Sequence, residues 1–361
     1  MYGLMSRSRV LLAFLSVHHA FGGWESAFIS NTEPRTLGAG GAVVGAQDGN
    51  LLAVPLSQGG GFALIGMSYG DCLFTACENT TVGNCGFGAG VIHVWRSPSL
   101  GQSDWAAPVE LLPAAQRPAG TYFRPHVIFN AATSKWVLWV RWLCCGSGAL
   151  SQQHTTYLSA LADRLEGPYT VAMANVTMFW PDSADDNLFV DEDGAAYIVH
   201  TARSTGTKIV VERLTPDCLQ SAGTRDPAAR SAPIGPGTTE APALFKVGST
   251  YYVSFARLCC YCTEGASTIV YTSPAPLGPY TPLTSLGNAP GGQQNFVFSA
   301  PDRLRGVLWS ANRWGSDPIH PNAPWFDYSL QYWSLLDIDA TSGNISALVW
   351  MDNFNVSVNI S

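Results

Sequence analysis

The chain has 361 residues, only 12% of them charged, and a formal net charge of −7. This acidic balance argues against nucleic acid or an acidic membrane surface as a partner. The sequence contains no run of 18 apolar residues of the kind that spans a membrane. With 36 glycines, 23 prolines and no Pro/Ser-rich or charge-dense linker, it favours one large all-β domain of short strands over residues 23–361.

The N-terminus has the layout of a secretory signal peptide. Arg7 and Arg9 precede the short apolar run Val10–Val17, and small and polar residues follow. We expect a signal peptide over residues 1–22 with cleavage near Ala20–Gly23, although a buried strand is the alternative. Five Asn-x-Ser/Thr sequons agree with a secreted, extracellular glycoprotein: Asn79, Asn175, Asn344, Asn355 and Asn359.

The nine cysteines point to the same compartment. They are Cys72, Cys77, Cys85, Cys144, Cys145, Cys218, Cys259, Cys260 and Cys262. Zinc would need paired C-x-x-C knuckles or nearby histidines, which the sequence lacks, so we predict no metal and no cofactor. Disulfides in an oxidising compartment fit better. Because nine is odd, at least one thiol is free or pairs between chains.

Along the chain, one unit recurs five times with a period of about 55–65 residues, and each copy is interpreted as four short strands. The units cover about 38–100, 122–170, 183–215, 238–282 and 291–350. GPYT occurs at both 167–170 and 278–281, and VRWLCC at 140–145 resembles FARLCC at 255–260. Radial repetition of small sheets predicts a five-bladed β-propeller. An irregular β-sandwich is the alternative.

Unit four places a carboxylate at the entrance to a hairpin. Glu240 lies two residues before Pro242, and the hairpin arms are Ala243–Phe245 and Tyr251–Phe255 with the turn at Gly248-Ser249. A poorly solvated carboxyl group can have a raised pKa and hold a proton near neutral pH, as a general acid must. A strand-end glutamate in water is the alternative.

The innermost strands of a propeller surround one channel. Three apolar doublets supply a register for them: Leu188-Phe189, Leu244-Phe245 and Val297-Phe298. On this register Glu240 corresponds to Gln293, and Asp185 falls one position further in. Anchoring unit two on its proline places Phe123 at the position of Glu240. We therefore predict a central pocket lined by Phe123, Asp185, Glu240 and Gln293, with Arg124 beside them and Asp71 at the end of the unit-one strand.

From about residue 38 to about 350 the chain resembles glycoside hydrolase family 43, a family of five-bladed propellers. The likeness rests on the order and spacing of several pieces: YGD at 69–71, RPHVIFNAATSKWVLWV at 124–140, SADDNLFVDEDGAAYIV at 183–199, EAPALFKVGSTYYV at 240–253 and NRW at 312–314. The branch that it resembles most contains the exo-β-1,3-galactanases.

The resemblance implies roles for the predicted pocket residues. Glu240 would be the general acid that protonates the leaving glycosidic oxygen, and Asp185 would orient it and tune its pKa. Gln293 would face the reacting sugar. Candidate substrate contacts are Asp71, Arg124, Phe123, Arg313 and Trp314. The family inverts the anomeric centre, which needs an acid and a water-activating group on opposite faces of the sugar.

The chain also departs from the family pattern. The usual aspartate base of the first blade has no evident counterpart, and Phe123 stands where the galactanase branch has a glutamate. Ala39-Gly40-Gly41 replaces a His-Gly-Gly start of that blade, and the loop after the blade-four hairpin carries Cys259-Cys260-Tyr261-Cys262 instead of tryptophan. The base is therefore unassigned: Gln293 is a poor proton acceptor, and Asp186 is only a nearby alternative.

We expect a secreted, monomeric O-glycosyl hydrolase whose partner is a polysaccharide or oligosaccharide of the β-galactan or arabinogalactan type. The alternatives are a carbohydrate-binding propeller that has lost catalysis, and an arabinofuranosidase or xylosidase of the same family. His126 and His200 are interpreted as structural residues, and DEDG at 191–194 as a hairpin turn rather than a calcium loop.

Overall fold

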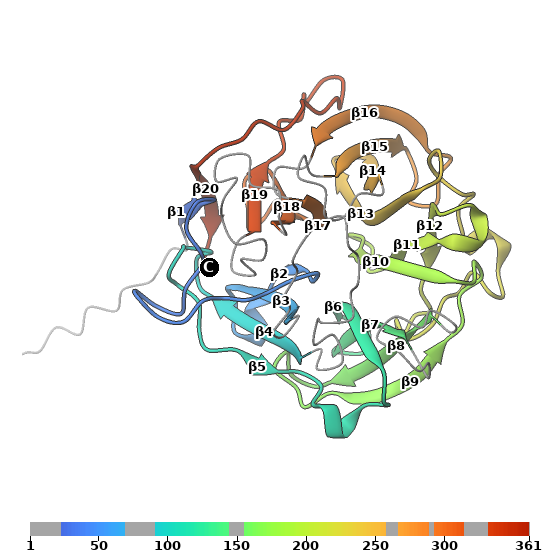
Figure 1. Ribbon diagram of the computed structural model, residues 1–361, viewed down its shortest axis with the longest axis horizontal. Coiled ribbons are helices and arrows are strands. Elements are labelled where there is room, and N and C mark those ends of the chain that lie inside the picture. The colour runs from blue at the N-terminus through green and yellow to red at the C-terminus, as the bar shows by residue number, and fades with distance from the viewer. Residues whose placement is uncertain are drawn as a thin grey trace, which may run out of the picture.

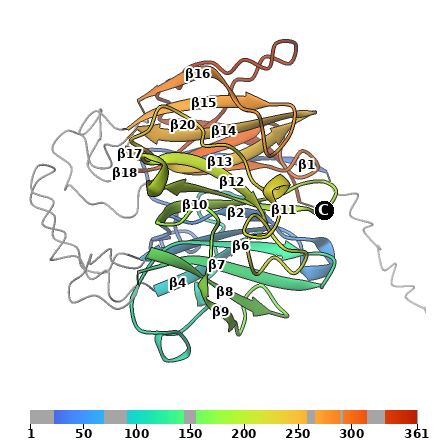
Figure 2. The same cartoon turned by 90° about the vertical axis from the view of Figure 1, so that its right-hand side faces the viewer.

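The computed structural model describes residues 23–68, 91–143, 155–257, 266–288, 292–313 and 331–360. Five sheets surround a central axis, and the first strand of each sheet lies innermost (Figure 1). The predicted five-bladed β-propeller is confirmed. Seen from the side, the blades stack around the axis as separate layers of strands (Figure 2). Within the described residues no helix is long and apolar enough to cross a membrane.

The blades follow one another in chain order. Blade I contains β2 (Leu51–Ala53), β3 (Phe62–Ser68), β4 (Val91–Ser97) and β5 (Val109–Glu110). Blade II contains β6 (Thr121–Asn130), β7 (Lys135–Leu143), β8 (Thr155–Ala162) and β9 (Thr170–Val176). Blade III contains β10 (Ser183–Val190), β11 (Ala196–Ala202) and β12 (Lys208–Arg213). Blade IV contains β13 (Thr239–Val247), β14 (Thr250–Arg257), β15 (Ser267–Ser273) and β16 (Thr281–Asn288). Blade V contains β17 (Gly292–Ser299), β18 (Val307–Arg313) and β19 (Gln331–Leu335). Short 3-10 helices occur at η1 (Leu56–Gln58), η4 (Ala114–Gln116), η6 (Arg203–Thr205) and η7 (Pro227–Ala229).

Local turn chemistry is as the sequence predicts. The blade IV hairpin turns at Gly248, whose φ of +58° suits a residue without a side chain. The GPYT repeats precede the outermost strands of blades II and IV, and their glycines, Gly167 and Gly278, have φ values of +84° and +90°. The DEDG segment is a hairpin turn, closed by a bond from the Asp191 N–H to the Ala195 carbonyl.

In the described part of the chain, blades III and V contain three strands instead of the predicted four. The outer position of blade III is taken by a segment that pairs only through the isolated bridges Leu214↔Ser221, Glu212↔Arg230 and Ile209↔Ile234. Pro227 and Pro233 interrupt this segment. Proline has no N–H to donate, so a continuous ladder cannot form there.

The ring is closed by a ribbon of the two terminal strands, β1 (Trp24–Ser30) and β20 (Asn353–Asn359), which pair antiparallel along their whole length. This ribbon, at the left edge of Figure 1, lies outside the predicted repeats. Its inner face, formed by Ala27, Ile29, Val356 and Val358, packs with core residues of blades I and V. Closure therefore depends on burying this face.

The residue after β1 fastens the ribbon to blade V. The Asn31 side chain is fully buried, and its Nδ2 donates to the carbonyls of Trp333 and Met351, both at 2.9 Å. Its Oδ1 accepts the Trp333 N–H at 2.8 Å. One side chain thus satisfies three backbone groups that have little access to water.

We predict that Asn31→Ala lowers the free energy of unfolding by about 3 kcal/mol, because buried backbone groups lose their partners. Urea-induced unfolding followed by tryptophan fluorescence measures this change. The control is Asn353→Ala, an exposed position on the same ribbon. Equal losses for the two variants would contradict the role of Asn31.

Candidate active site

A β-bulge interrupts the innermost strands β6, β10, β13 and β17 near their starts. In β6 and β13 the unpaired residues include Pro125 and Pro242, which cannot donate to a ladder. The residues before these prolines, Arg124 and Ala241, have φ values of +49° and +53°. This shared backbone supports the predicted equivalence of Phe123 and Glu240. Bulges redirect side chains, and here they bring polar groups of all five blades together at the axis.

Arg124 lies at the centre of this cluster and is almost completely buried. Its Nε lies 3.3 Å from Asp185 Oδ2 of blade III, and one terminal nitrogen lies 3.6 Å from Asp48 Oδ1 of blade I. The same nitrogen donates to Gln293 Oε1 of blade V at 3.2 Å. Burial alone would lower the pKa of Arg124, but Asp185, Asp48 and Glu240 raise it above the ordinary value. The guanidinium is therefore a permanent charge.

Asp185 is held by two cations. Arg141 Nη1 lies 3.1 Å from its Oδ1, in addition to the contact with Arg124. Burial by itself would raise the pKa of Asp185, but Arg124, Arg141 and Arg203 together hold it below the ordinary value. The backbone N–H of Ala241 also donates to this carboxylate. Asp185 thus stays ionised and fixes the backbone beside Glu240, which fits the predicted modulator.

Glu240 is half-buried, and its Oε1 accepts a 2.6 Å hydrogen bond from Gln293 Nε2. The carbonyl oxygen of Gln293 accepts from Arg124. Both the oxygen and the nitrogen of this amide are therefore hydrogen-bonded to neighbouring side chains. Gln293 is placed to orient Glu240, and this hydrogen bonding leaves the amide poorly suited to take a proton from water.

Asp48, which the sequence interpretation treated as part of a turn, also belongs to the cluster. It lies just before β2, only 3% exposed, and accepts from Asn312 Nδ2 at 2.6 Å. Burial, assisted by the charge of Asp185, raises the pKa of Asp48 to about 6, although Arg124 and Asn312 oppose the shift. Blade I thus supplies a buried aspartate to the cluster, at a position that the sequence interpretation treated as turn chemistry. Ala39-Gly40-Gly41 is exposed and is not the start of the inner strand, which residues 47–50 precede instead.

Comparison with known proteins finds one matching family and several solved structures of similar fold. Residues 132–287 match the model of "Glycosyl hydrolases family 43". The fold resembles a GH43 beta 1,3 galactosidase (TM-score 0.67, 20% identity) and exo-beta-1,3-galactanases from Clostridium thermocellum (0.70, 20%) and Phanerochaete chrysosporium (0.68, 19%). Each alignment covers 92% of this chain, and 64%, 67% and 69% of the respective structures. None of the curated proteins matches the chain significantly.

The predicted resemblance to glycoside hydrolase family 43 is confirmed. The family match covers less than half of the chain. At about 20% identity, the solved structures establish the propeller fold and leave the sugar open.

The remaining predicted family 43 positions are distributed as follows. The Phe123 ring lies 5.8 Å from the guanidinium carbon of Arg141, at the edge of the cluster. Arg313 donates to the Asn31 carbonyl at 2.5 Å and lies over the Trp350 ring, beside the ring-closing segment. Its contact with substrate stays a prediction. Asp71, Trp314, Asn79 and every cysteine except Cys218 lie outside the described residues. Cys218 is a free, buried thiol, and the predicted disulfides fall on cysteines outside the described residues.

Asp186, the alternative base, is enclosed between blades II and III. Its Oδ2 lies 3.4 Å from Nδ1 of His126, and both side chains are fully buried. Burial raises the pKa of Asp186, and His126 opposes the shift. Asp186 contributes to packing between blades, whereas Asp48 contacts Arg124 directly.

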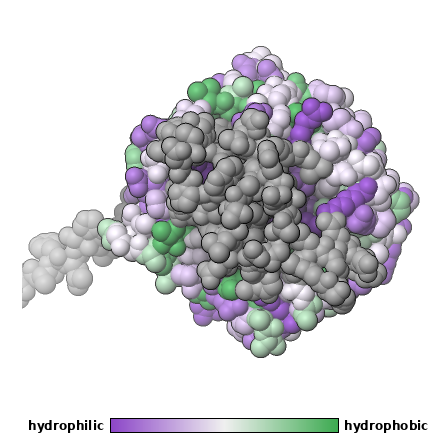
Figure 3. All heavy atoms as spheres, in the orientation of Figure 1, coloured by the Kyte–Doolittle hydropathy of each residue, from purple (hydrophilic) through white to green (hydrophobic). Residues whose placement is uncertain are grey.

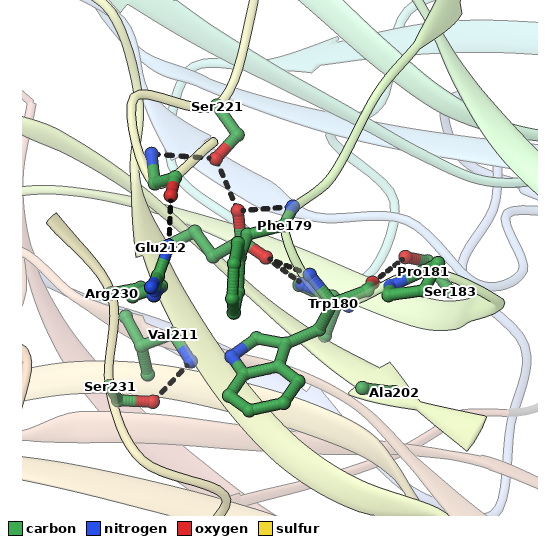
Figure 4. A network of polar contacts seen from close by, with 12 residues as sticks. Phe179, Trp180, Pro181, Ser183, Ala202, Val211, Glu212, Ser221, Arg230 and Ser231 are labelled. Atoms are coloured by element: carbon green, nitrogen blue, oxygen red, sulfur yellow. Dashed lines mark hydrogen bonds and ion pairs between the residues drawn. The ribbon is translucent and has the colours of Figure 1, made fainter. Parts of the chain in front are cut away.

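A further buried carboxylate, Glu212 on β12, holds the segment that leads into β10 (Figure 4). It accepts the backbone N–H groups of Phe179 and Trp180 at 3.1 and 3.2 Å. It also bonds to His200 Nε2 at 3.2 Å and to the Ser221 hydroxyl. Because β10 carries Asp185, this network positions the site from outside it. The sequence gives no signal for it, since its members come from separate segments.

We predict that Glu212→Gln lowers the free energy of unfolding by about 3 kcal/mol near pH 7, because an amide cannot accept from all these donors. Burial would raise the pKa of Glu212, but His200, Ser221 and the backbone lower it. Its contribution is therefore present above the ordinary carboxyl pKa of about 4.3 and is lost as pH falls through the lower folded value. Urea titrations at several pH values test this.

The matched control for Glu212→Gln is Glu192→Gln, since the Glu192 side chain is 80% exposed. It should change stability by less than about 1 kcal/mol. The difference in free energy of unfolding between Glu212→Gln and the parent protein should shrink at acid pH. A constant difference would argue against an ionised Glu212.

Proposed function

We propose that this protein hydrolyses a glycosidic bond at the end of a β-galactan or arabinogalactan-like chain, with inversion, using Glu240 as general acid and Asp48 as general base. The observation that carries the proposal is the Arg124-centred cluster. In this cluster the half-buried Glu240 is linked through the Gln293 amide to the Arg124 guanidinium. The guanidinium in turn lies beside Asp48, whose pKa is raised.

The two carboxyl groups suit different tasks. Glu240 is partly accessible and is oriented by Gln293, so it can deliver a proton to the leaving oxygen. Asp48, with a pKa of about 6, is ionised at neutral pH and basic enough to take a proton from water as the oxygen bonds to the anomeric carbon. Contacts through Arg124 and Gln293 link the two groups, and an inverting mechanism needs room for a water molecule between the base and the sugar.

Asp185 serves the acid without reacting. Its carboxylate accepts the backbone N–H of Ala241, the residue next to Glu240, and so fixes the backbone that presents the acid. Arg124 and Arg141 keep that charge in place during the cycle. The preference for galactan follows the names of the similar structures, which are galactanases and a galactosidase. A secreted, monomeric protein with a signal peptide at residues 1–22 completes the proposal.

We expect the purified protein to release galactose from β-1,3-galacto-oligosaccharides, and Glu240→Gln to lower kcat by about 10²–10⁴ without weakening substrate binding. Chromatography of released sugar and calorimetric binding measure the two quantities. The decrease in kcat caused by Glu240→Gln should be much smaller for an aryl galactoside with a good leaving group, because its aryloxide can leave with little protonation. Parallel incubations with arabinan and xylan oligosaccharides identify the alternative specificities.

A carbohydrate-binding propeller without catalysis is the second candidate, and Phe123, an apolar residue among polar groups, favours it. Such a protein would bind glycan but release no sugar from any substrate. The Glu240→Gln substitution would then have no turnover to abolish. Binding without release in the parent protein would overturn the hydrolase proposal.

The pH profile tests Asp48. We predict that kcat/KM falls about tenfold per unit as pH drops below about 6, because protonated Asp48 cannot accept a proton. In Asp48→Asn this acid limb should disappear and the rate should fall about 10²–10⁴-fold. Asp163→Asn is the control, since the side chain of Asp163 is 82% exposed. An unchanged acid limb in Asp48→Asn would exclude Asp48 as the base.

A further inference from the structure

The ring-closing ribbon has an outer face of unusual composition. Side chains alternate between the two faces of a strand, so Trp24 and Phe28 of β1 point away from the core while Ala27 and Ile29 point into it. Trp24 is 38% exposed and Phe28 is 50% exposed. Among the residues that are coloured in Figure 3, hydrophobic ones form small separate patches.

The sequon asparagines of β20 lie directly opposite these aromatic residues. Phe28 pairs with Asn355, and Trp24 pairs with Asn359. Directly opposed residues of an antiparallel pair project to the same side, with Cβ atoms about 4.5–5.5 Å apart. Asn355 is exposed, and its sequon continues with Val356 on the buried face and Ser357 on the outer face.

The two asparagines are not equivalent. Nδ2 of Asn359 donates to the Asp302 carbonyl at 3.1 Å, and the residue is half-buried. The ring of Trp24 is already covered by Arg305, whose guanidinium lies 4.6 Å from it. Among the described residues Phe28 has no ring or cation partner. Asn355 and Phe28 are therefore the accessible acceptor and the uncovered apolar surface.

We propose that Asn355 carries an N-linked glycan whose first N-acetylglucosamine packs on the Phe28 ring and stabilises ring closure. In the transfer, Nδ2 of Asn355 bonds to C1 of the sugar and loses a proton. The bond from C1 to the pyrophosphate of a lipid-linked oligosaccharide donor breaks, and the lipid pyrophosphate leaves. The donor belongs to the secretory route that residues 1–22 predict.

The attached sugar has two physical effects. A pyranose ring presents an apolar C–H face, which removes part of the Phe28 ring from water and contributes favourably to the paired ribbon. β1 is also an edge strand, and a bulky polar group over it hinders pairing with another chain. The modification is independent of the proposed glycosidase activity, so either can fail alone.

The test uses the full chain secreted from a eukaryotic host. Peptide mapping after glycan release in heavy-oxygen water marks each occupied asparagine as a labelled aspartate. We expect the label at Asn355. Thermal unfolding is then compared for the parent, Phe28→Ala, Ser357→Ala and the double variant, and for protein trimmed enzymatically to one sugar.

Removing the sequon with Ser357→Ala should lower Tm, and trimming to one sugar should not. Phe28→Ala should lower Tm by roughly 2 °C more with the glycan than in the Ser357→Ala background. Thr177→Ala, which removes the exposed Asn175 sequon on blade II, is the control and should leave the effect of Phe28→Ala unchanged. An unlabelled Asn355, or equal Phe28→Ala effects in both backgrounds, would overturn the proposal.

Discussion

One buried guanidinium governs the centre of this propeller. Arg124 comes from blade II and contacts Asp48 of blade I, Asp185 of blade III and Gln293 of blade V, and Gln293 in turn holds Glu240 of blade IV. Burying a cation without partners is strongly unfavourable. Arg124 can therefore be buried at the centre only when its partners from the neighbouring blades are in place. The site exists only when the ring is closed. The terminal ribbon, which packs on blades I and V, therefore supports the central cluster although it lies at the outer edge of the molecule.

The backbone that presents Arg124 is itself unusual. A non-glycine residue with a φ of +49° is uncommon and costs of the order of 1–3 kcal/mol, as does Ala241 at the same point of blade IV. Both precede a proline inside a bulge, where no ladder bond could form. The strain is tolerated because these positions aim Arg124 at the axis and turn the Ala241 N–H towards Asp185.

The features that could be predicted from the sequence are those that recur in every unit of the repeat. The repeated units, the proline alignment of Phe123 with Glu240 and the convergence of Asp185 and Gln293 follow from periodicity, because equivalent strands of a propeller meet at the axis. Asp48 was missed because Asp-Gly-Asn is also ordinary turn chemistry, and its φ of +52° shows that the local interpretation was sound. Only the three-dimensional arrangement shows that this turn abuts Arg124.

The ring-closing ribbon and the Glu212 network were missed for a different reason. β1 and β20 pair across almost the whole chain, and β1 shows no strict alternation of apolar and polar residues. Glu212 satisfies backbone groups more than 30 residues away. A pairing between distant segments leaves little trace in either segment alone, whereas a repeat is visible within one sequence.

The charges of the centre give a physical reason for an apolar residue at position 123. Asp48 and Asp185 both lie near Arg124, and Asp185 also contacts Arg141, so each of these guanidinium groups already faces a carboxylate. A glutamate at position 123 would add a third negative charge beside Arg141, which is already committed to Asp185. An aromatic ring there adds no charge and still packs against the guanidinium. Under the proposed mechanism, the departure at position 123 is therefore weaker evidence for lost catalysis than the sequence alone indicated.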